Sequence, residues 1–196
     1  LVLQETHFHV IAIEPSPIRY QKLQLIRHRW PARFQVFNCA VGDREGEMDL
    51  YEVGEDGGGS TLVPEALQIP YLSSQLVAQT TCLVRTLDDV ASEVLAMPGW
   101  NLPISLLKID VEGFEDLVLD GATSLIETRT PSAVQFEGNW HQLFRQTTVM
   151  DLANRLHGYE LFQLLPGKRG LARRDPNDWR TNVFSHANWV MMPSGR

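Results

Sequence analysis

The chain has little positive charge. Its 17 Lys and Arg stand against 24 Asp and Glu, which gives a formal net charge of −7 over 196 residues. This balance argues against binding to nucleic acid or to an anionic membrane, because phosphate contacts need clustered Lys and Arg. The nearest approach to a basic patch lies at 168–174, close to Gly and Pro residues, and we interpret it as a solvated loop.

Cysteines and long apolar runs are also scarce. Cys39 and Cys82 are the only two cysteines, and they show neither metal-ligand spacing nor a redox Cys-x-x-Cys motif. One disulfide is formally possible, but we expect two reduced, buried thiols. No run approaches the ~20 apolar residues of a membrane span, and no signal peptide is visible. These absences favour a cytoplasmic protein, and we assign no metal ligands.

The rest of the composition is that of a folded domain. A hydrophobic content of 43% and a charged content of 21% suit one domain over residues 1–196 with a substantial core. His9–Ile13 is predicted to be a buried strand, and Phe34–Val41 the next one. Between them, Ser16 suits the N-cap of an amphipathic helix over Pro17–Arg29. This strand–helix–strand order predicts parallel pairing through a right-handed crossover.

Strands and helices continue to alternate along the chain. We expect strands at Glu47–Val53, Leu83–Arg85, Ile104–Asp110, Ala133–Glu137, Tyr159–Leu165 and Asn182–Met192, the last two antiparallel at the sheet edge. We expect helices at Leu87–Ala96, Phe114–Asp120, Ser124–Thr128 and Met150–Leu156, with Thr86 capping the first. The Gly-rich segment Gly54–Ser60 is interpreted as a mobile loop, because no phosphate-binding helix follows it.

Two of the predicted strands end in acidic residues. Glu14 follows His9–Ile13, Asp110 ends Ile104–Asp110, and Glu112 lies in the turn after it. Open α/β sheets bind ligands outside the carboxyl ends of their strands. A carboxylate in the place of Glu14 can accept hydrogen bonds from two ribose hydroxyls, so it indicates a nucleoside. The alternative for Glu14 is a charge that stabilises the N-terminus of the following helix.

These motifs resemble a known family. Lys108–Glu115 (KIDVEGFE), with Ala12–Pro15 (AIEP) before it and Thr86–Asp88 (TLD) between, is similar to the FkbM-type S-adenosylmethionine-dependent methyltransferases. The resemblance covers about His9 to Glu137 and continues more weakly to the C-terminus. It implies a Rossmann-like, mostly parallel sheet of the class I methyltransferase type with an antiparallel edge strand. It also implies methyl transfer to a hydroxyl of a small molecule or sugar.

The resemblance also implies roles for particular residues. Asp110 would lie beside the methionine part of S-adenosylmethionine and the acceptor, and Ala40 and Val41 would contact the adenine. Plain packing explains Ala40 and Val41 equally well. Glu112 is open between a cofactor contact and a place in a turn. The family has a loop near its site that corresponds to Gly54–Ser60, so a lid role for this segment is open too.

The strand that ends in Glu137 could complete the site. If it neighbours Ile104–Asp110, then Asp110, Glu112 and Glu137 converge, and like charges at close range raise one another's pKa. Lys108, a bound metal or the sulfonium of the cofactor could reduce the repulsion between these carboxylates. Lys108 is expected to pair with a carboxylate. One carboxylate, or His141, could serve as general base. For His141, the alternative is a surface histidine after a strand.

One part of the family pattern is missing from the sequence. Methyltransferases of this type begin with a strand and a glycine-rich turn, and nothing before His9 supplies them. The first residue is Leu rather than Met, so we expect upstream residues in the natural protein. Without that strand, His9–Ile13 has an unprotected edge. A degenerate, non-catalytic module is the alternative function, and a nicotinamide-dependent oxidoreductase with Glu14 on the ribose ranks third.

Overall fold

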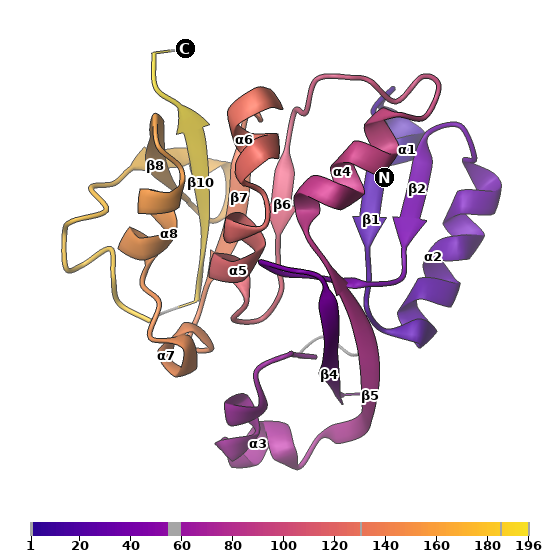
Figure 1. Ribbon diagram of the computed structural model, residues 1–196. Coiled ribbons are helices and arrows are strands. Elements are labelled where there is room, and N and C mark those ends of the chain that lie inside the picture. Colours follow the sequence, from indigo (N-terminus) through magenta and orange to yellow (C-terminus); the bar gives the residue numbers. More distant parts are fainter. Residues whose placement is uncertain (1, 55–59, 130, 185, 196) are drawn as a thin grey trace.

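The chain begins with the predicted strand–helix–strand unit. The computed structural model describes residues 2–54, 60–129, 131–184 and 186–195. After the short helix α1 (Val2–Glu5) come β1 (Val10–Ile13), α2 (Pro17–Arg29) and β2 (Phe34–Phe37), and β1 pairs with β2 in parallel (Figure 1). The Ser16 side chain accepts a hydrogen bond from the backbone of Arg19, which confirms the predicted N-cap.

The prediction of one strand over Phe34–Val41 is wrong. The chain leaves the sheet after Phe37 and forms a second strand, β3 (Ala40–Val41), which pairs with β5 (Leu76–Arg85) instead of β1. Asn38 marks the break, since its side-chain amide donates to the backbone carbonyls of Glu14 and Pro15 at 2.9 and 3.1 Å. This contact ties the end of β2 to the turn after β1.

A three-stranded sheet of order β3-β5-β4 extends away from the rest of the chain in Figure 1. Its antiparallel pair is β4 (Gly46–Val53), as predicted, and β5, which is much longer than the predicted Leu83–Arg85. The short helices η1 (Pro64–Gln68) and α3 (Pro70–Ser73) pack beside it. Most of the Gly54–Ser60 loop, at 55–59, lies outside the described residues.

The largest sheet has five strands in the order β6-β7-β10-β8-β9. These are β6 (Leu107–Ile109), β7 (Val134–Gly138), β8 (Tyr159–Leu164), β9 (Leu171–Arg173) and β10 (Ala187–Pro193). The pair β6–β7 is parallel and the other pairs are antiparallel. The two closing strands β8 and β10 pair antiparallel, as predicted, but the unpredicted β9 lies outside them and forms the edge of the sheet.

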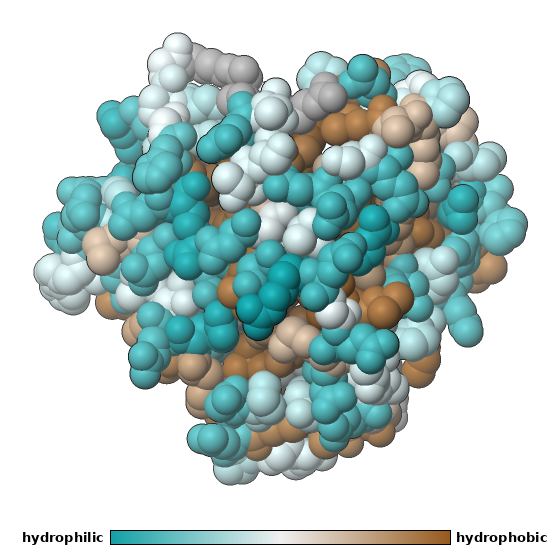
Figure 2. Space-filling view, viewed as in Figure 1, coloured by the Kyte–Doolittle hydropathy of each residue, from teal (hydrophilic) through white to brown (hydrophobic). Residues whose placement is uncertain are grey.

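Helices pack against this sheet and enclose the main core. They are α4 (Leu87–Leu95), α5 (Glu115–Asp120), α6 (Thr123–Arg129) and α8 (Val149–Arg155). The short helix α7 (Gln142–Arg145) instead packs Phe144 against the core beside the three-stranded sheet. Phe136 and Val134 on β7 are fully buried against Leu119 of α5 and Leu152 of α8. Hydrophilic residues predominate on the face seen in Figure 2, with apolar residues in smaller areas between them. No helix in the described ranges has both the length and the apolar character of a membrane span.

The parallel strand pairs lie in separate sheets. Among the described residues, β1 pairs with β2 alone and β6 pairs with β7 alone, while the parallel pair β3–β5 belongs to the three-stranded sheet. Contacts between side chains still join the two parts, since Ile13 of β1 packs against the core around Ile109 of β6.

The Thr86–Asp88 motif has a structural role that can be tested. Thr86 accepts a hydrogen bond from the backbone of Asp89 at 3.1 Å and caps α4, as predicted. Replacing Thr86 with Ala is expected to lower the free energy of unfolding by about 1 kcal/mol, because a lost N-cap costs about that much. Urea unfolding measures it, with the exposed Thr81→Ala on β5 as control. Equal effects of both substitutions would contradict the capping role.

Asp88 in the same motif links two helices. Its carboxylate accepts hydrogen bonds from the backbone N–H groups of Ser124 and Leu125, at 2.9 and 2.7 Å, at the start of α6. These N–H groups have no partner within their own helix, because the first turn of a helix leaves four donors unpaired. Asp88 therefore stabilises α6, and the motif is explained without a ligand.

Candidate functional site

The acidic strand ends lie at one edge of the fold. The arrowheads of β1 and β2 point opposite to that of β10 in Figure 1. Because β7 is antiparallel to β10 and parallel to β6, the carboxyl ends of β1, β2, β6 and β7 point the same way. Glu14 after β1, Asp110 after β6 and Glu137 in β7 therefore lie on the same side of the fold, at the carboxyl ends of the strands. This is where α/β sheets bind ligands.

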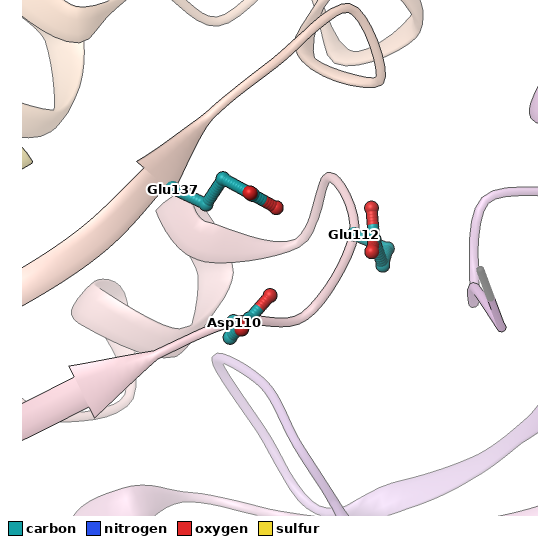
Figure 3. A group of neighbouring side chains, drawn as sticks. All are labelled: Asp110, Glu112 and Glu137. Carbon is teal, nitrogen blue, oxygen red and sulfur yellow. The ribbon is translucent and has the colours of Figure 1, made fainter. Parts of the chain in front are cut away.

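Three carboxylates converge at this edge. Asp110, Glu112 and Glu137 each offer an oxygen that lies within 4.8 Å of the others. Figure 3 shows Asp110 at the end of β6, Glu112 in the turn that follows and Glu137 on the neighbouring strand, around a common space. The parallel pairing of β6 and β7 produces this arrangement, as expected from the sequence. Carboxylate oxygens at this spacing could hold a hard divalent cation or another positively charged group.

Each of these carboxylates already has a nitrogen partner. The Lys108 ammonium pairs with Asp110, which confirms the ion pair expected for that lysine. The ring of His186 contacts Glu137, and Nδ1 of His141 lies 2.9 Å from Oε2 of Glu112. Both histidine contacts are ion pairs only when the ring is protonated. The cluster therefore has positive charge available within the chain, and its net charge depends on two histidines.

The turn between β6 and α5 fixes the position of Glu112. Glu112 adopts φ = 51° and Gly113 φ = 106°, backbone conformations that side chains disfavour. The hydroxyl of Thr61 donates to the carbonyl of Glu112 at 2.9 Å and holds the turn from outside. A Cβ at Gly113 would lie 3.0 Å from Cβ of His141. Glycine is therefore needed here both for its φ and for the close approach of His141.

His141 is buried, so its interpretation as a surface histidine is wrong. It is 4% exposed, and its backbone N–H and ring Nδ1 lie 2.8 and 3.1 Å from Oδ1 of Asn139. The ring of Trp140 covers it with centroids 3.7 Å apart. Its Nε2 is buried and has no hydrogen-bond partner among the described residues. A buried nitrogen without a partner is costly, so this atom marks a place where a polar group of a ligand would be favourable.

Two residues of the cluster were not predicted from the sequence. The side-chain amide of Asn139 donates to both Glu112 and Glu137, at 3.2 Å each, and so bridges two like charges. His186 reaches Glu137 because Ala187 of β10 pairs with Gly138 of β7. Asn139 directly follows β7, and its place in the Gly-Asn-Trp-His segment is the one cue that could have found it. His186 is distant in sequence, and only the strand order brings it near.

Glu14 is held at the start of α2. Its Oε1 accepts the backbone N–H of Ser16 at 2.9 Å and lies 3.5 Å from the guanidinium of Arg19. Its side chain is 17% exposed. These contacts agree with the alternative role of Glu14, a charge that stabilises the N-terminus of α2. They also fix the direction of its carboxylate at the carboxyl end of β1.

Ala40 and Val41 are packed rather than exposed. They are 4% and 7% exposed and belong to two different core clusters on either side of β3. Plain packing therefore accounts for both residues. Two surface hollows of about 390 and 600 Å³ lie elsewhere, along β8 and β9 near Arg173 and Arg174.

Glu115 is the least exposed of the acidic residues near the cluster. It is 1% exposed, and its carboxylate accepts the backbone N–H groups of Val111 and Gly113, both at 3.4 Å. Burial raises the pKa of Glu115 from 4.5 to about 7; the two N–H groups lower this pKa and the charge of Glu112 raises it. No pattern in the sequence indicates that this carboxylate is buried.

Parallel strands with acidic carboxyl ends, joined to an antiparallel edge, define a class I methyltransferase-like α/β fold. The model of the methyltransferase FkbM domain matches residues 2–161. The chain therefore belongs to the FkbM methyltransferase family. It is also similar to the crystal structure of methyltransferase FkbM from Methylobacillus flagellatus KT, with a TM-score of 0.51 and 19% identity. The match covers 93% of this chain and 36% of that one. No curated protein matches the chain.

Proposed function

We propose that this chain is part of an S-adenosylmethionine-dependent methyltransferase that methylates a hydroxyl group of a small molecule or sugar. The observation that supports it most is the meeting of Asp110, Glu112 and Glu137 at the edge where the parallel strands end. A negatively charged edge suits a cationic sulfonium, and carboxylates suit ribose hydroxyls as partners. Membership of the FkbM family supports the reaction class.

We assign different parts of the cofactor to different residues. Glu14, held by Ser16 and Arg19, is proposed to accept hydrogen bonds from the ribose hydroxyls. Asp110 is the most accessible carboxylate of the cluster, with its side chain 43% exposed, and is proposed to lie beside the methionine part. Ala40 and Val41 are proposed to contact the adenine. Both side chains are almost fully buried, so this contact would involve the small part of them that stays exposed.

His141 is proposed to be the general base. When Nδ1 of a neutral histidine donates a hydrogen bond to a carboxylate, the lone pair is left on Nε2. Glu112 lies at Nδ1 of His141, and Nε2 has no partner among the described residues. S-adenosylmethionine supplies an electrophilic methyl group. His141 would take the proton of the acceptor hydroxyl as the hydroxyl oxygen bonds to the methyl carbon and the carbon–sulfur bond breaks, which leaves neutral S-adenosylhomocysteine. Asp110 and Glu137 would stabilise the positive charge that His141 gains.

Calorimetric titration with S-adenosylhomocysteine tests the proposal on the full-length protein. Replacing Glu14 with Ala is expected to weaken binding about tenfold or more, because hydrogen bonds to a charged group contribute about 1.5–3 kcal/mol. The matched control is Glu47→Ala, which removes an exposed carboxylate on β4 and is expected to leave the affinity unchanged.

Two results would overturn the proposal. The first is no binding heat with the unaltered protein at millimolar ligand. The second is equal affinity in Glu14→Ala and Glu47→Ala. The first result would favour the alternative function, a non-catalytic module.

A further inference from the structure

Glu115 lies directly beneath the turn that carries Glu112. It is the first residue of α5, and its carboxylate turns back to the N–H groups of Val111 and Gly113, which flank Glu112 in sequence. Charged acceptors strengthen such hydrogen bonds, so this carboxylate holds both sides of the turn. With Thr61 on the carbonyl of Glu112, the turn is fixed from two directions.

The turn needs this support because its backbone is strained. Glu112, a non-glycine residue at φ = 51°, keeps this conformation only where the surroundings fix it. The benefit of this geometry is the position of the Glu112 side chain, which lies 2.9 Å from Nδ1 of His141 and 3.2 Å from the amide of Asn139. If the turn relaxed, Glu112 would move away from His141.

The charge of Glu115 changes near neutral pH. Burial is the main reason that its pKa lies at about 7, and the negative charge of Glu112 adds to it. The neighbouring Asp116 on α5 faces the other way, toward Arg145 at 2.9 Å. A protonated Glu115 would be a weaker acceptor for the two backbone N–H groups.

We propose that Glu115 is a positioning residue whose ionised carboxylate holds the turn at 111–113, so that Glu112 orients His141, and that proton uptake by Glu115 releases this turn. The consequence for catalysis rests on the proposed function, because it requires His141 to act as the base. The contact itself is independent of any ligand. The site would then be ordered above neutral pH and loosened below it.

Solution NMR of the ligand-free protein tests the inference. The amide resonance of Gly113 is expected to titrate with a midpoint at about pH 7, because its N–H donates to Glu115. This titration should vanish in Glu115→Gln and persist in His141→Gln, which removes the nearby histidine. The amide of Gly42, which donates to the carbonyl of Arg85 at 3.0 Å, should stay constant and serves as an internal control.

The ring nitrogens of His141 give the readout for positioning. In the unaltered protein at pH 8 they should report one tautomer, with the proton on Nδ1. In Glu115→Gln they should report a mixture, although the fold is retained. A Gly113 amide that is constant from pH 5.5 to 8.5 in the unaltered protein overturns the inference, and so does a single His141 tautomer in Glu115→Gln. Since no ligand is present, neither result depends on whether S-adenosylhomocysteine binds.

Discussion

Replacing Gly121 with Ala is expected to destabilise the protein by about 3 kcal/mol or more. The added Cβ would lie 2.0 Å from the carbonyl oxygen of Gly42 and 3.0 Å from its carbon. Neither backbone can move easily, because the N–H of Gly42 donates to Arg85 and the carbonyl of Gly121 accepts from Asp88. Overpacking typically costs about 1–3 kcal/mol, and a clash between two backbones belongs at the upper end.

Thermal and urea unfolding measure this effect. A loss of about 3 kcal/mol lowers the Tm by about 6–12 °C in a chain of this size. Gly46→Ala is the matched control, because its Cβ would have no atom within 4 Å and its φ is not positive. Its cost is expected to stay below about 1 kcal/mol. Similar costs at the two glycines would show that α5 and β3 are not in close contact.

Glu115→Gln is expected to change how stability depends on pH. The pKa of Glu115 rises from 4.5 to about 7 on folding. Between these values the native state binds a proton that the unfolded state has lost, so stability falls as pH rises from 4.5 to 7 and is then constant. At 1.36 kcal/mol per pKa unit, the loss is about 3 kcal/mol. A neutral glutamine has no such loss, so the variant gains relative stability up to pH 7.

Urea unfolding of both proteins from pH 5 to pH 8 measures the difference directly. The control is Asp151→Asn, since the hydrogen bonds from Thr148 hold the pKa of Asp151 below its ordinary value of 3.8. The stability from Asp151 is lost only as pH falls below that value, so its difference from the unaltered protein should be constant in this range. A constant difference for Glu115→Gln as well would show that Glu115 does not bind a proton near pH 7.

Local patterns predicted most of the helices and strands, and the strand order followed only in part. The Ser16 and Thr86 caps and the β1–α2–β2 unit depend on neighbouring residues, so the sequence reveals them. The break at Asn38 depends on carbonyls more than 20 residues away, and no local pattern contains it. The short β9 pairs only with β8, where Phe162 meets Arg173, and its three residues are too few for a period to be visible.

For the candidate site too, one part could be predicted from the sequence and another part depends on how distant residues pack. The convergence of Asp110, Glu112 and Glu137 follows from adjacent parallel strands, which the sequence predicts. Burial of His141 and the bridge by Asn139 depend on how Trp140 and the turn at 111–113 pack. The cofactor and catalytic roles of these residues, and those of Glu14, Ala40 and Val41, stay predictions until ligand binding is measured.

Because β1 and β6 lie in different sheets, the β1–α2–β2 unit is expected to unfold locally more easily than the rest of the chain. Together with α1, the β1–α2–β2 unit has a small core of its own. Among the described residues, Leu3, Phe34 and Val36 are buried in it, whereas the cluster around Phe136 is far larger. Units with few buried apolar contacts exchange their amide protons earliest. Glu14 belongs to the unit with the small core, and Asp110 belongs to the part with the large core. A ligand that contacts both residues would therefore reduce local opening of the β1–α2–β2 unit. The protection of the β1 amides against hydrogen exchange would then increase as more of the protein binds the ligand.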